Sequence, residues 1–203
     1  MMPTAHPAYY LSCMIKIIAT VFALALSTGP LRAAPQDYAL DPDQSQVRYE
    51  VNFGSDVIHG TMPVASADVQ IDFARVSNSR VDVTLSPGAA TANFPLAAQA
   101  LRGPRVLAAD AYPAVSFVSS KVQSSGTGAV IEGDITIRNV TRPIALDAAF
   151  FRPQGTAAGD RSELWLRLTG AISRAAFGAG GFGDLVDDEV RLNILAKIDR
   201  VEG

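Results

Sequence analysis

Few side chains of this sequence are suited to acid–base, nucleophilic or metal chemistry. Beyond residue 33 the only histidine is His59, which a hydrolytic triad would need as its base and which lies in a predicted loop. The acidic residues at 184–189 lie near the start of a predicted strand, where a solvated turn explains them. Metal sites usually need several convergent histidines, cysteines or carboxylates. The sequence therefore predicts no catalytic residue and no metal.

Phosphate and nucleic-acid binding are also disfavoured. The glycine-rich run GAGGFG at residues 178–183 lacks the strand-to-helix context of a phosphate-binding loop. The chain has a net charge of −3 and scattered arginines, whereas nucleic-acid-binding proteins carry basic patches. We therefore expect a binding protein, with no enzymatic activity, no cofactor and no nucleic-acid partner.

The stretch at residues 133–147, GDITIRNVTRPIALD, gives the main structural signal. Isoleucines alternate with polar residues, and after a predicted turn at 139–143 the alternation resumes through Leu146. Successive side chains point to opposite faces of a strand. Pro143 opens the second run, where no ladder N–H is needed. The pattern predicts two strands joined by a turn.

The same alternation continues along the chain and predicts eight strands. Only residues 95–109 have helical spacing, and Gly103-Pro104 interrupts that segment. The expected strands are 45–53, 67–73, 80–85, 115–122, 131–137, 144–151, 163–172 and 189–198.

Eight one-sided strands with short connections predict an all-β, eight-stranded antiparallel barrel with one short helical segment. Closure removes the exposed sheet edges that lead to aggregation. A barrel of this size is either filled by side chains or holds one small ligand, and alternation alone leaves both open. We expect inward side chains to be buried, among them Phe53, Val83, Ile135, Leu166 and Ile194.

The tract at residues 171–185, AISRAAFGAGGFGDL, is glycine-rich and apolar and has no obvious strand period. One interpretation is a flexible mouth for a lipid tunnel. The other is a permissive loop whose phenylalanines plug the end of the barrel.

A secretory leader is predicted at the N-terminus. Residues 14–33, MIKIIATVFALALSTGPLRA, combine a lysine, an apolar core and small residues before a cut after Ala33. The apolar core at 17–26 is too short to cross a membrane. We expect residues 1–33 to be removed and residues 34–203 to form one domain in the periplasm.

Six short motifs occur in a fixed order between residues 38 and 198. They are Tyr38-Ala39-Leu40-Asp41; residues 69–72; Leu101-Arg102; Tyr112-Pro113 with Val115, Phe117 and Ser119-Ser120; residues 133–146; and Ser173-Arg174 with Phe177-Gly178 and Asp188-Glu189-Val190. Together they resemble the YceI-like family, secreted bacterial proteins associated with polyisoprenoid and other lipid binding. The resemblance implies a lipocalin-like barrel with an apolar tunnel for an isoprenoid-type chain, and no enzymatic activity.

Several positions depart from the family pattern. The family often has His-x-G where this chain has Asn52-Phe53-Gly54. Residues 97–100 read AAQA where Asp, Lys or His is usual, and Arg105-Val106 replace a common Asp and Phe. The polar groups that would hold a ligand head are thus largely small or apolar here, and the identity of the head group cannot be transferred.

Two functions stay open. The first is a periplasmic carrier for an isoprenoid, quinone or fatty-acyl ligand held in the barrel. The second is a filled barrel that acts through its outer surface as an interaction or regulatory subunit, for example of a membrane redox protein. If the barrel is a lipid tunnel, the residues near its helical segment and glycine-rich tract should contact the lipid. The candidates are Phe94, Leu101, Tyr112, Phe117, Trp165 and Phe177, although strict alternation puts Trp165 on the outer face.

The leader gives a prediction about processing. Exported protein should begin at Ala34, because Ala33 is a small residue at the cut and Pro30 ends the apolar helix before it. Intact-mass measurement of exported protein checks this. A product that retains Lys16 would contradict it.

Overall fold

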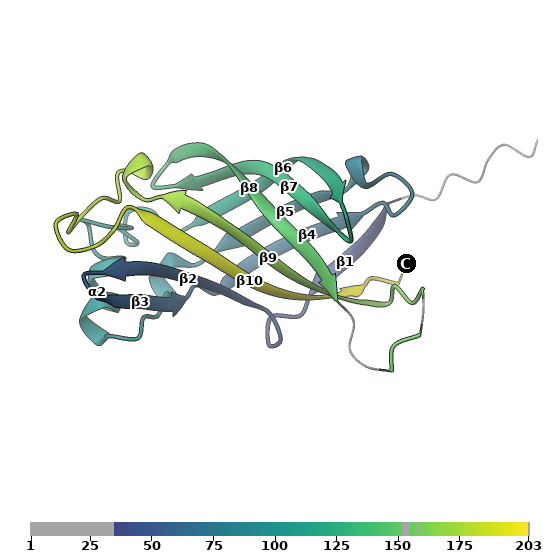
Figure 1. The fold of residues 1–203 in the computed structure, drawn as a ribbon, viewed down its shortest axis with the longest axis horizontal. Helices are drawn as coiled ribbons and strands as arrows, with labels where there is room; N and C mark the ends of the chain where they lie inside the picture. The colour runs from purple at the N-terminus through teal and green to yellow at the C-terminus, as the bar shows by residue number, and fades with distance from the viewer. Residues whose placement is uncertain (1–34, 152–154, 158, 203) are drawn as a thin grey trace, which may run out of the picture. The chain divides into compact units, whose positions relative to one another are not determined.

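The computed structural model describes residues 35–151, 155–157 and 159–202, and the predicted leader lies outside these ranges. Ten strands make up most of the described chain (Figure 1). They are β1 (Gln36–Leu40), β2 (Gln46–Phe53), β3 (Asp56–Thr61), β4 (Val64–Ile71), β5 (Arg80–Leu85), β6 (Val115–Ser125), β7 (Gly128–Ile137), β8 (Val140–Phe151), β9 (Glu163–Ser173) and β10 (Glu189–Arg200).

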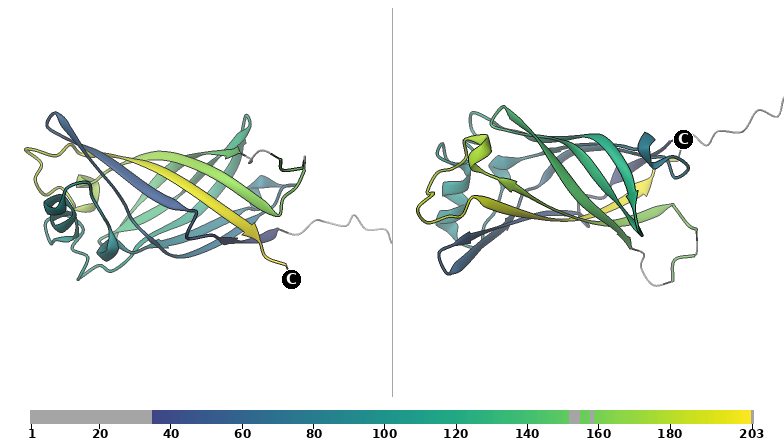
Figure 2. Two further views of the ribbon diagram at one scale, coloured as in Figure 1. Left: turned by 90° about the horizontal axis from the view of Figure 1, so that it is seen from below. Right: turned by 45° about the horizontal axis from the view of Figure 1, so that its top comes forward.

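Eight of these strands close into an antiparallel barrel (Figures 1 and 2). Their order is β1, β4, β5, β6, β7, β8, β9 and β10, and β10 pairs back onto β1, where Arg200 lies opposite Tyr38. The fold that the sequence predicts is therefore confirmed. Closure pairs both sides of each barrel strand over part of its length, so none of them is a free edge strand.

The other two strands form a hairpin that extends the wall at one end. β2 pairs with the first part of β10, and β3 pairs with β2. Residues 91–93 run along the outer side of β3: the Thr91 N–H donates to the Thr61 carbonyl at 2.9 Å, and the Asn93 N–H donates to the His59 carbonyl at 2.9 Å. This cover occupies backbone groups that would otherwise invite pairing with another chain.

The sequence pattern does not predict β1 and β3. Each has only five or six residues, and β3 reads DVIHGT, which does not alternate strictly. The eight expected strands therefore include β2 in place of β1, which closes the barrel. His59, expected in a loop, lies in β3 with its side chain exposed.

The β7–β8 connection is shorter than the turn expected at 139–143. Arg138 and Asn139 both have positive φ, 52° and 59°, as a two-residue hairpin turn of the type I′ class requires. β8 begins at Val140, so Pro143 lies inside a strand. A proline is tolerated there because β8 pairs with β9 only from Asp147 onward.

The helical segment is confirmed but ends earlier than the pattern at 95–109 suggests. The α-helix α2 spans Pro95–Arg102, and Gly103 follows it as the C-cap. Proline suits the first turn because that N–H has no partner within the helix. Three short 3₁₀ turns complete the described chain: Val76–Asn78, Pro87–Ala89 and Ala175–Phe177. Within the described ranges, no helix is long and apolar enough to cross a bilayer.

β10 changes its partner in mid-strand, and polar side chains stabilise that point. Residues 191–195 pair with β2, residues 198–200 pair with β1, and Lys197 lies between them. Its ammonium group contacts the carboxylates of Asp41 at 3.0 Å, Asp199 at 3.1 Å and Glu163 at 3.5 Å. The hydrogen bonds with Asp41 and Asp199 raise the pKa of Lys197 above its usual range. The Ser45 hydroxyl accepts the Lys197 backbone N–H at 3.0 Å, so the strand keeps a partner at the junction.

Burial agrees with the expected inward faces at four of five positions. Ile135 and Leu166 are buried, and Val83 and Ile194 are half-buried because they border empty interior space. The prediction that Phe53 is buried is wrong, because this residue is 37% exposed. It has the inward parity of β2 but is the last residue of that strand, beside the turn, where the barrel wall ends.

Leu166 and Arg167 test the register of β9. Leu166 is 8% exposed and Arg167 lies on the outer face. Leu166→Asp should lower the free energy of unfolding by about 3–5 kcal/mol more than Arg167→Asp, because it buries an unpaired charge and loses apolar burial. Urea unfolding of the two variants measures the difference. Equal unfolding midpoints would show that the register is wrong.

Candidate functional site

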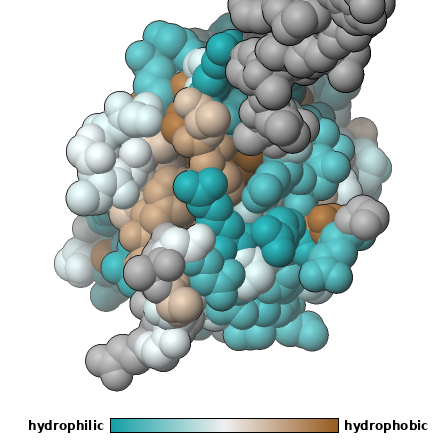
Figure 3. All heavy atoms as spheres, turned by 90° about the vertical axis from the view of Figure 1, so that its right-hand side faces the viewer, coloured by the Kyte–Doolittle hydropathy of each residue, from teal (hydrophilic) through white to brown (hydrophobic). Residues whose placement is uncertain are grey.

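One half of the barrel interior is filled by side chains. Tyr38, from β1, is 3% exposed, and its hydroxyl donates a hydrogen bond to the Arg161 carbonyl at 2.8 Å. From outside, the corresponding end of the barrel shows an apolar strip among hydrophilic residues (Figure 3). The packed side chains include Tyr38, Val69, Val122, Ala129, Ala148, Leu164, Leu166 and Ile198.

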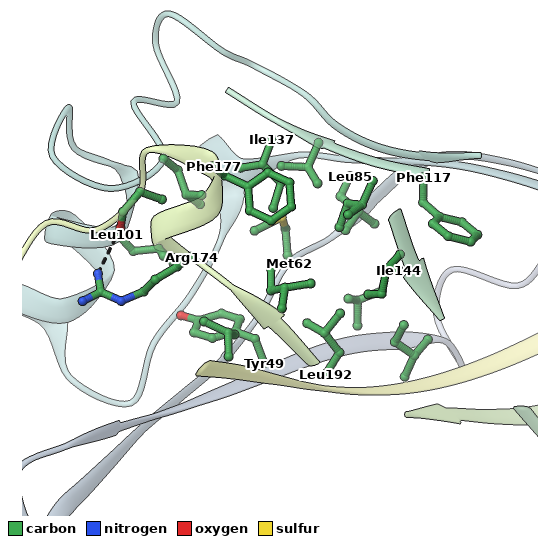
Figure 4. A pocket seen from close by; sticks show the side chains of 18 of the residues that line it. Tyr49, Met62, Leu85, Leu101, Phe117, Ile137, Ile144, Arg174, Phe177 and Leu192 are labelled. Atoms are coloured by element: carbon green, nitrogen blue, oxygen red, sulfur yellow. Dashed lines mark hydrogen bonds between the residues drawn. The ribbon is translucent and has the colours of Figure 1, made fainter. Parts of the chain in front are cut away.

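The other half contains a cavity of about 280 Å³. Inward side chains of strands on opposite walls line it, and Figure 4 shows Leu192 on one side of the space and Leu85 and Phe117 on another, with Met62 between them. Well-packed interiors contain few voids larger than a water molecule. A space of this size inside a closed barrel is therefore a candidate binding site.

Non-barrel elements cover the end of the cavity. α2 contributes Ala97, Ala100 and Leu101 to the lining, and the glycine-rich segment contributes Phe177 and Phe182. Figures 1 and 2 show both elements at the same end of the barrel, next to the β2–β3 hairpin. The second interpretation of the 171–185 tract, phenylalanines that plug the barrel end, fits this arrangement better than a flexible mouth.

Arg174 holds the glycine-rich segment in place. It is 7% exposed, and its guanidinium donates to four backbone carbonyls, those of Ala179 (3.0 Å), Gly181 (2.6 Å), Val186 (2.7 Å) and Asp187 (2.8 Å). Figure 4 shows the guanidinium pointing away from Ile144 and Phe117. The aliphatic stem of Arg174 can thus face the cavity while its charge is bound within the loop.

A second arginine joins the same segment to the loop that follows α2. The Arg138 guanidinium donates to the Val106 carbonyl at 2.8 Å and to the Gly178 carbonyl. Gly181 lies so close to this loop that a Cβ atom would come within 2.4 Å of the Arg105 carbonyl oxygen. Only glycine fits at position 181, so part of the glycine content serves close packing rather than flexibility.

The cavity lining is almost entirely apolar. Among the described residues that line it, the only charged one is Arg174, and the other polar side chains are Ser45, Tyr49 and Ser116. The Tyr49 hydroxyl donates to the Thr91 carbonyl, and burial raises the pKa of Tyr49 to about 12, so the phenol stays neutral. The Ser45 hydroxyl is hydrogen-bonded to the Lys197 backbone. Charged ligand groups would therefore find little compensation inside.

The family model of the YceI-like domain matches residues 38–198 of this chain. The chain belongs to the YceI-like family. A UPF0312 protein of Vibrio parahaemolyticus is 28% identical over 139 residues, which are 66% of this chain and 73% of that protein.

Two solved structures share the barrel fold. BcnA of Burkholderia cenocepacia matches with a TM-score of 0.68 and 19% identity, over 78% of this chain and 98% of that chain. A polyisoprenoid binding domain from Saccharophagus degradans matches with a TM-score of 0.54 and 11% identity, over 81% of this chain and 98% of that chain. At these identities the likeness is one of fold.

Within this YceI-like barrel, three of the six candidate contact residues line the cavity: Leu101, Phe117 and Phe177. They come from α2, β6 and the 3₁₀ turn that packs on β8, so the fold brings together residues far apart in the sequence. That they contact a ligand stays a prediction.

The other three candidates lie outside the lining. Phe94 precedes α2 and is 44% exposed, since it lies on the outer side of the covering elements. Tyr112 is half-buried, and the Arg138 guanidinium lies 5.8 Å from its ring. Trp165 is on the outer face of β9, as alternation indicates, with its indole N–H donating to Glu163 at 2.7 Å and its ring 5.8 Å from that of Phe151.

Sequence reasoning missed several lining residues. Leu85 and Leu192 have the inward parity of predicted strands, so alternation carried a usable signal for them. Met62 lies in the β3–β4 connection, and no pattern marks it. In the sequence, Arg174 stood out only as part of a family motif. Its structural role depends on backbone carbonyls that the loop brings together.

Arg174 gives a prediction for the cover of the cavity. Arg174→Lys should lower the free energy of unfolding by at least about 1.5–3 kcal/mol, because one ammonium group cannot reach four carbonyls in the planar geometry of a guanidinium. Amide hydrogen exchange at residues 175–188 should also become faster. Arg167→Lys, on the exposed face of β9, is the matched control. Unchanged exchange in the Arg174 variant would contradict the assigned role.

Proposed function

We propose that the protein is a non-enzymatic periplasmic binding or carrier protein for an apolar chain ligand of isoprenoid, quinone or fatty-acyl type. The observation that carries this proposal is the apolar cavity of about 280 Å³ inside the closed barrel. Small-molecule sites in proteins are mostly apolar and range from about 300 to 1,000 Å³. At about 280 Å³ the cavity lies just below that range, so it suits a single hydrocarbon chain rather than a bulky ligand.

The chemistry of the lining favours an uncharged chain. Burying a polar group without a hydrogen-bonding partner costs about 1–3 kcal/mol in proteins, and burying a charge costs more. Tyr49 and Arg174, which could offer hydrogen bonds, are already bonded to backbone carbonyls. A head group would therefore lie at the end of the cavity rather than in its middle.

The absence of enzymatic activity is proposed on the same lining. No Asp, Glu, His, Lys or Cys is among the cavity-lining residues that the structure describes. Those side chains supply most general acids, bases and nucleophiles in enzymes. A reaction in this cavity would therefore lack the side chains that usually act as general acid, general base or nucleophile.

The shared fold adds support, since one structural relative is a polyisoprenoid binding domain. Export to the periplasm is proposed on the predicted leader at residues 1–33. The alternative, a filled barrel that regulates a partner such as a membrane redox protein, does not account for the cavity. That partner stays a prediction without an observation of its own.

A matched pair of phenylalanine substitutions tests the ligand site. Val83 faces the cavity from β5, whereas Val118 lies on the outer wall and is 48% exposed. Protein purified from its own periplasm should carry a lipid-sized mass in native mass spectrometry. Val83→Phe should weaken the affinity for that lipid by about tenfold or more, which corresponds to roughly 1.4 kcal/mol, and so lower the fraction of protein that carries the mass. Val118→Phe should leave it unchanged.

Thermal unfolding of the same variants separates a hollow from a filled site. Overpacking a filled core costs about 1–3 kcal/mol, whereas the cavity has room for the added ring. Val83→Phe should therefore unfold at a temperature equal to or above that of the wild type without lipid. If the wild type carries no bound lipid and Val83→Phe loses much stability, the proposed carrier function is wrong.

A further inference from the structure

Five large apolar side chains are exposed at the end of the barrel that covers the cavity. They come from the β2–β3 hairpin, from the start of α2 and from the glycine-rich segment, which Figures 1 and 2 show together at this end. This apolar rim consists of Phe53 (37% exposed), Val57 (40%), Phe94 (44%), Leu96 (79%) and Leu185 (58%).

Hydrogen bonds connect the elements of the apolar rim. The Gly54 N–H donates to the Leu185 carbonyl at 3.1 Å, which joins the hairpin to the glycine-rich segment. The Asn93 side chain donates to the Val57 carbonyl at 3.0 Å, which joins the hairpin to the segment that leads into α2. These bonds hold the elements that carry the exposed residues together at one end of the barrel.

The same elements face the cavity on their inner side. α2 exposes Leu96 and places Leu101 in the lining, and the hairpin exposes Val57 and places Ile58 there. The glycine-rich segment exposes Leu185 and lines the cavity with the next residue, Val186. The cover of the cavity thus carries apolar side chains on both its inner and its outer side.

We propose that the apolar rim docks on a lipid bilayer and that the cavity takes up or releases its ligand there. This proposal rests on the proposed function, because an apolar chain is stable in a bilayer and not in water. Exposed apolar patches that border a binding site mark interaction surfaces. Among the possible occupants, a bilayer is the one that is also a reservoir of the ligand.

The charges around the apolar rim favour a bilayer surface without net charge. Its elements carry Glu50, Asp56 and Asp184 together with Arg48, with Asp187 two residues beyond the glycine-rich segment, and they carry no lysine. Two arginines near α2 already have a partner within the chain: Arg102 donates to the Ala98 carbonyl at 3.2 Å, and the Arg105 guanidinium lies 4.1 Å from the Phe182 ring centre. Docking on anionic lipids uses clusters of free Lys and Arg, so insertion of apolar side chains is the expected attraction here.

Flotation with phosphatidylcholine vesicles tests the proposal. Wild-type protein without its leader should float with the vesicles, and L96S/L185S should show a partition coefficient lower by about tenfold or more, as the loss of two buried leucines implies. V118S/V201S is the matched control, since Val118 in β6 is 48% exposed and Val201, just after β10, is 52% exposed, and neither belongs to the apolar rim. The control should float like the wild type.

The outcomes separate this proposal from the proposed function. Three results would overturn membrane docking as proposed: flotation that requires phosphatidylglycerol, an equal loss of flotation in both double variants, or no flotation of the wild type. In the last case a protein partner would be the remaining occupant of the apolar rim. Native mass spectrometry of the same samples reports the cavity. A bound lipid without flotation refutes only the docking surface. Flotation without any bound lipid refutes the carrier function and, with it, ligand exchange at the bilayer, and leaves only membrane docking.

Discussion

The closed ring of backbone hydrogen bonds is the constraint on which the rest of this structure depends. β10 pairs with β9 on one side and with β2 and then β1 on the other, and the junction at Lys197 keeps its polar groups bonded. The ring provides hydrogen-bonding partners for the strand backbones without help from the interior. The barrel therefore does not need packed interior side chains along its whole length. One half is packed around Tyr38, and the other half can stay hollow.

The hollow half needs a cover that does not depend on apolar packing alone. Arg174 and Arg138 provide it by donating to backbone carbonyls of the glycine-rich segment. A buried guanidinium is costly unless its donors are occupied, and several carbonyls meet that need without placing a carboxylate near the cavity. The loop is thereby ordered while its inner surface remains apolar, which is what a hydrocarbon ligand requires.

Departures from the family pattern have a consequence in this cavity. Residues 97–100 read AAQA, and Ala97 and Ala100 lie in the lining where longer polar side chains would project into it. Small residues on α2 enlarge the covered end and remove hydrogen-bonding groups from it. The proposed ligand is accordingly defined by its chain, and the apolar rim outside the same helix agrees with a route through a bilayer.

The sequence by itself determined the strand-rich fold and most inward faces, because a period of two is a local property of the chain. Ile135 and Leu166 are buried as that period indicates. Phe53 has the right parity and is exposed, since parity does not tell where the wall of the barrel ends. Only the tertiary structure decided that β1 closes the ring, that Leu101, Phe117 and Phe177 line one cavity, and that this part of the interior is left empty. Each of these depends on distances between segments far apart in the chain, and alternation carries no information about such distances.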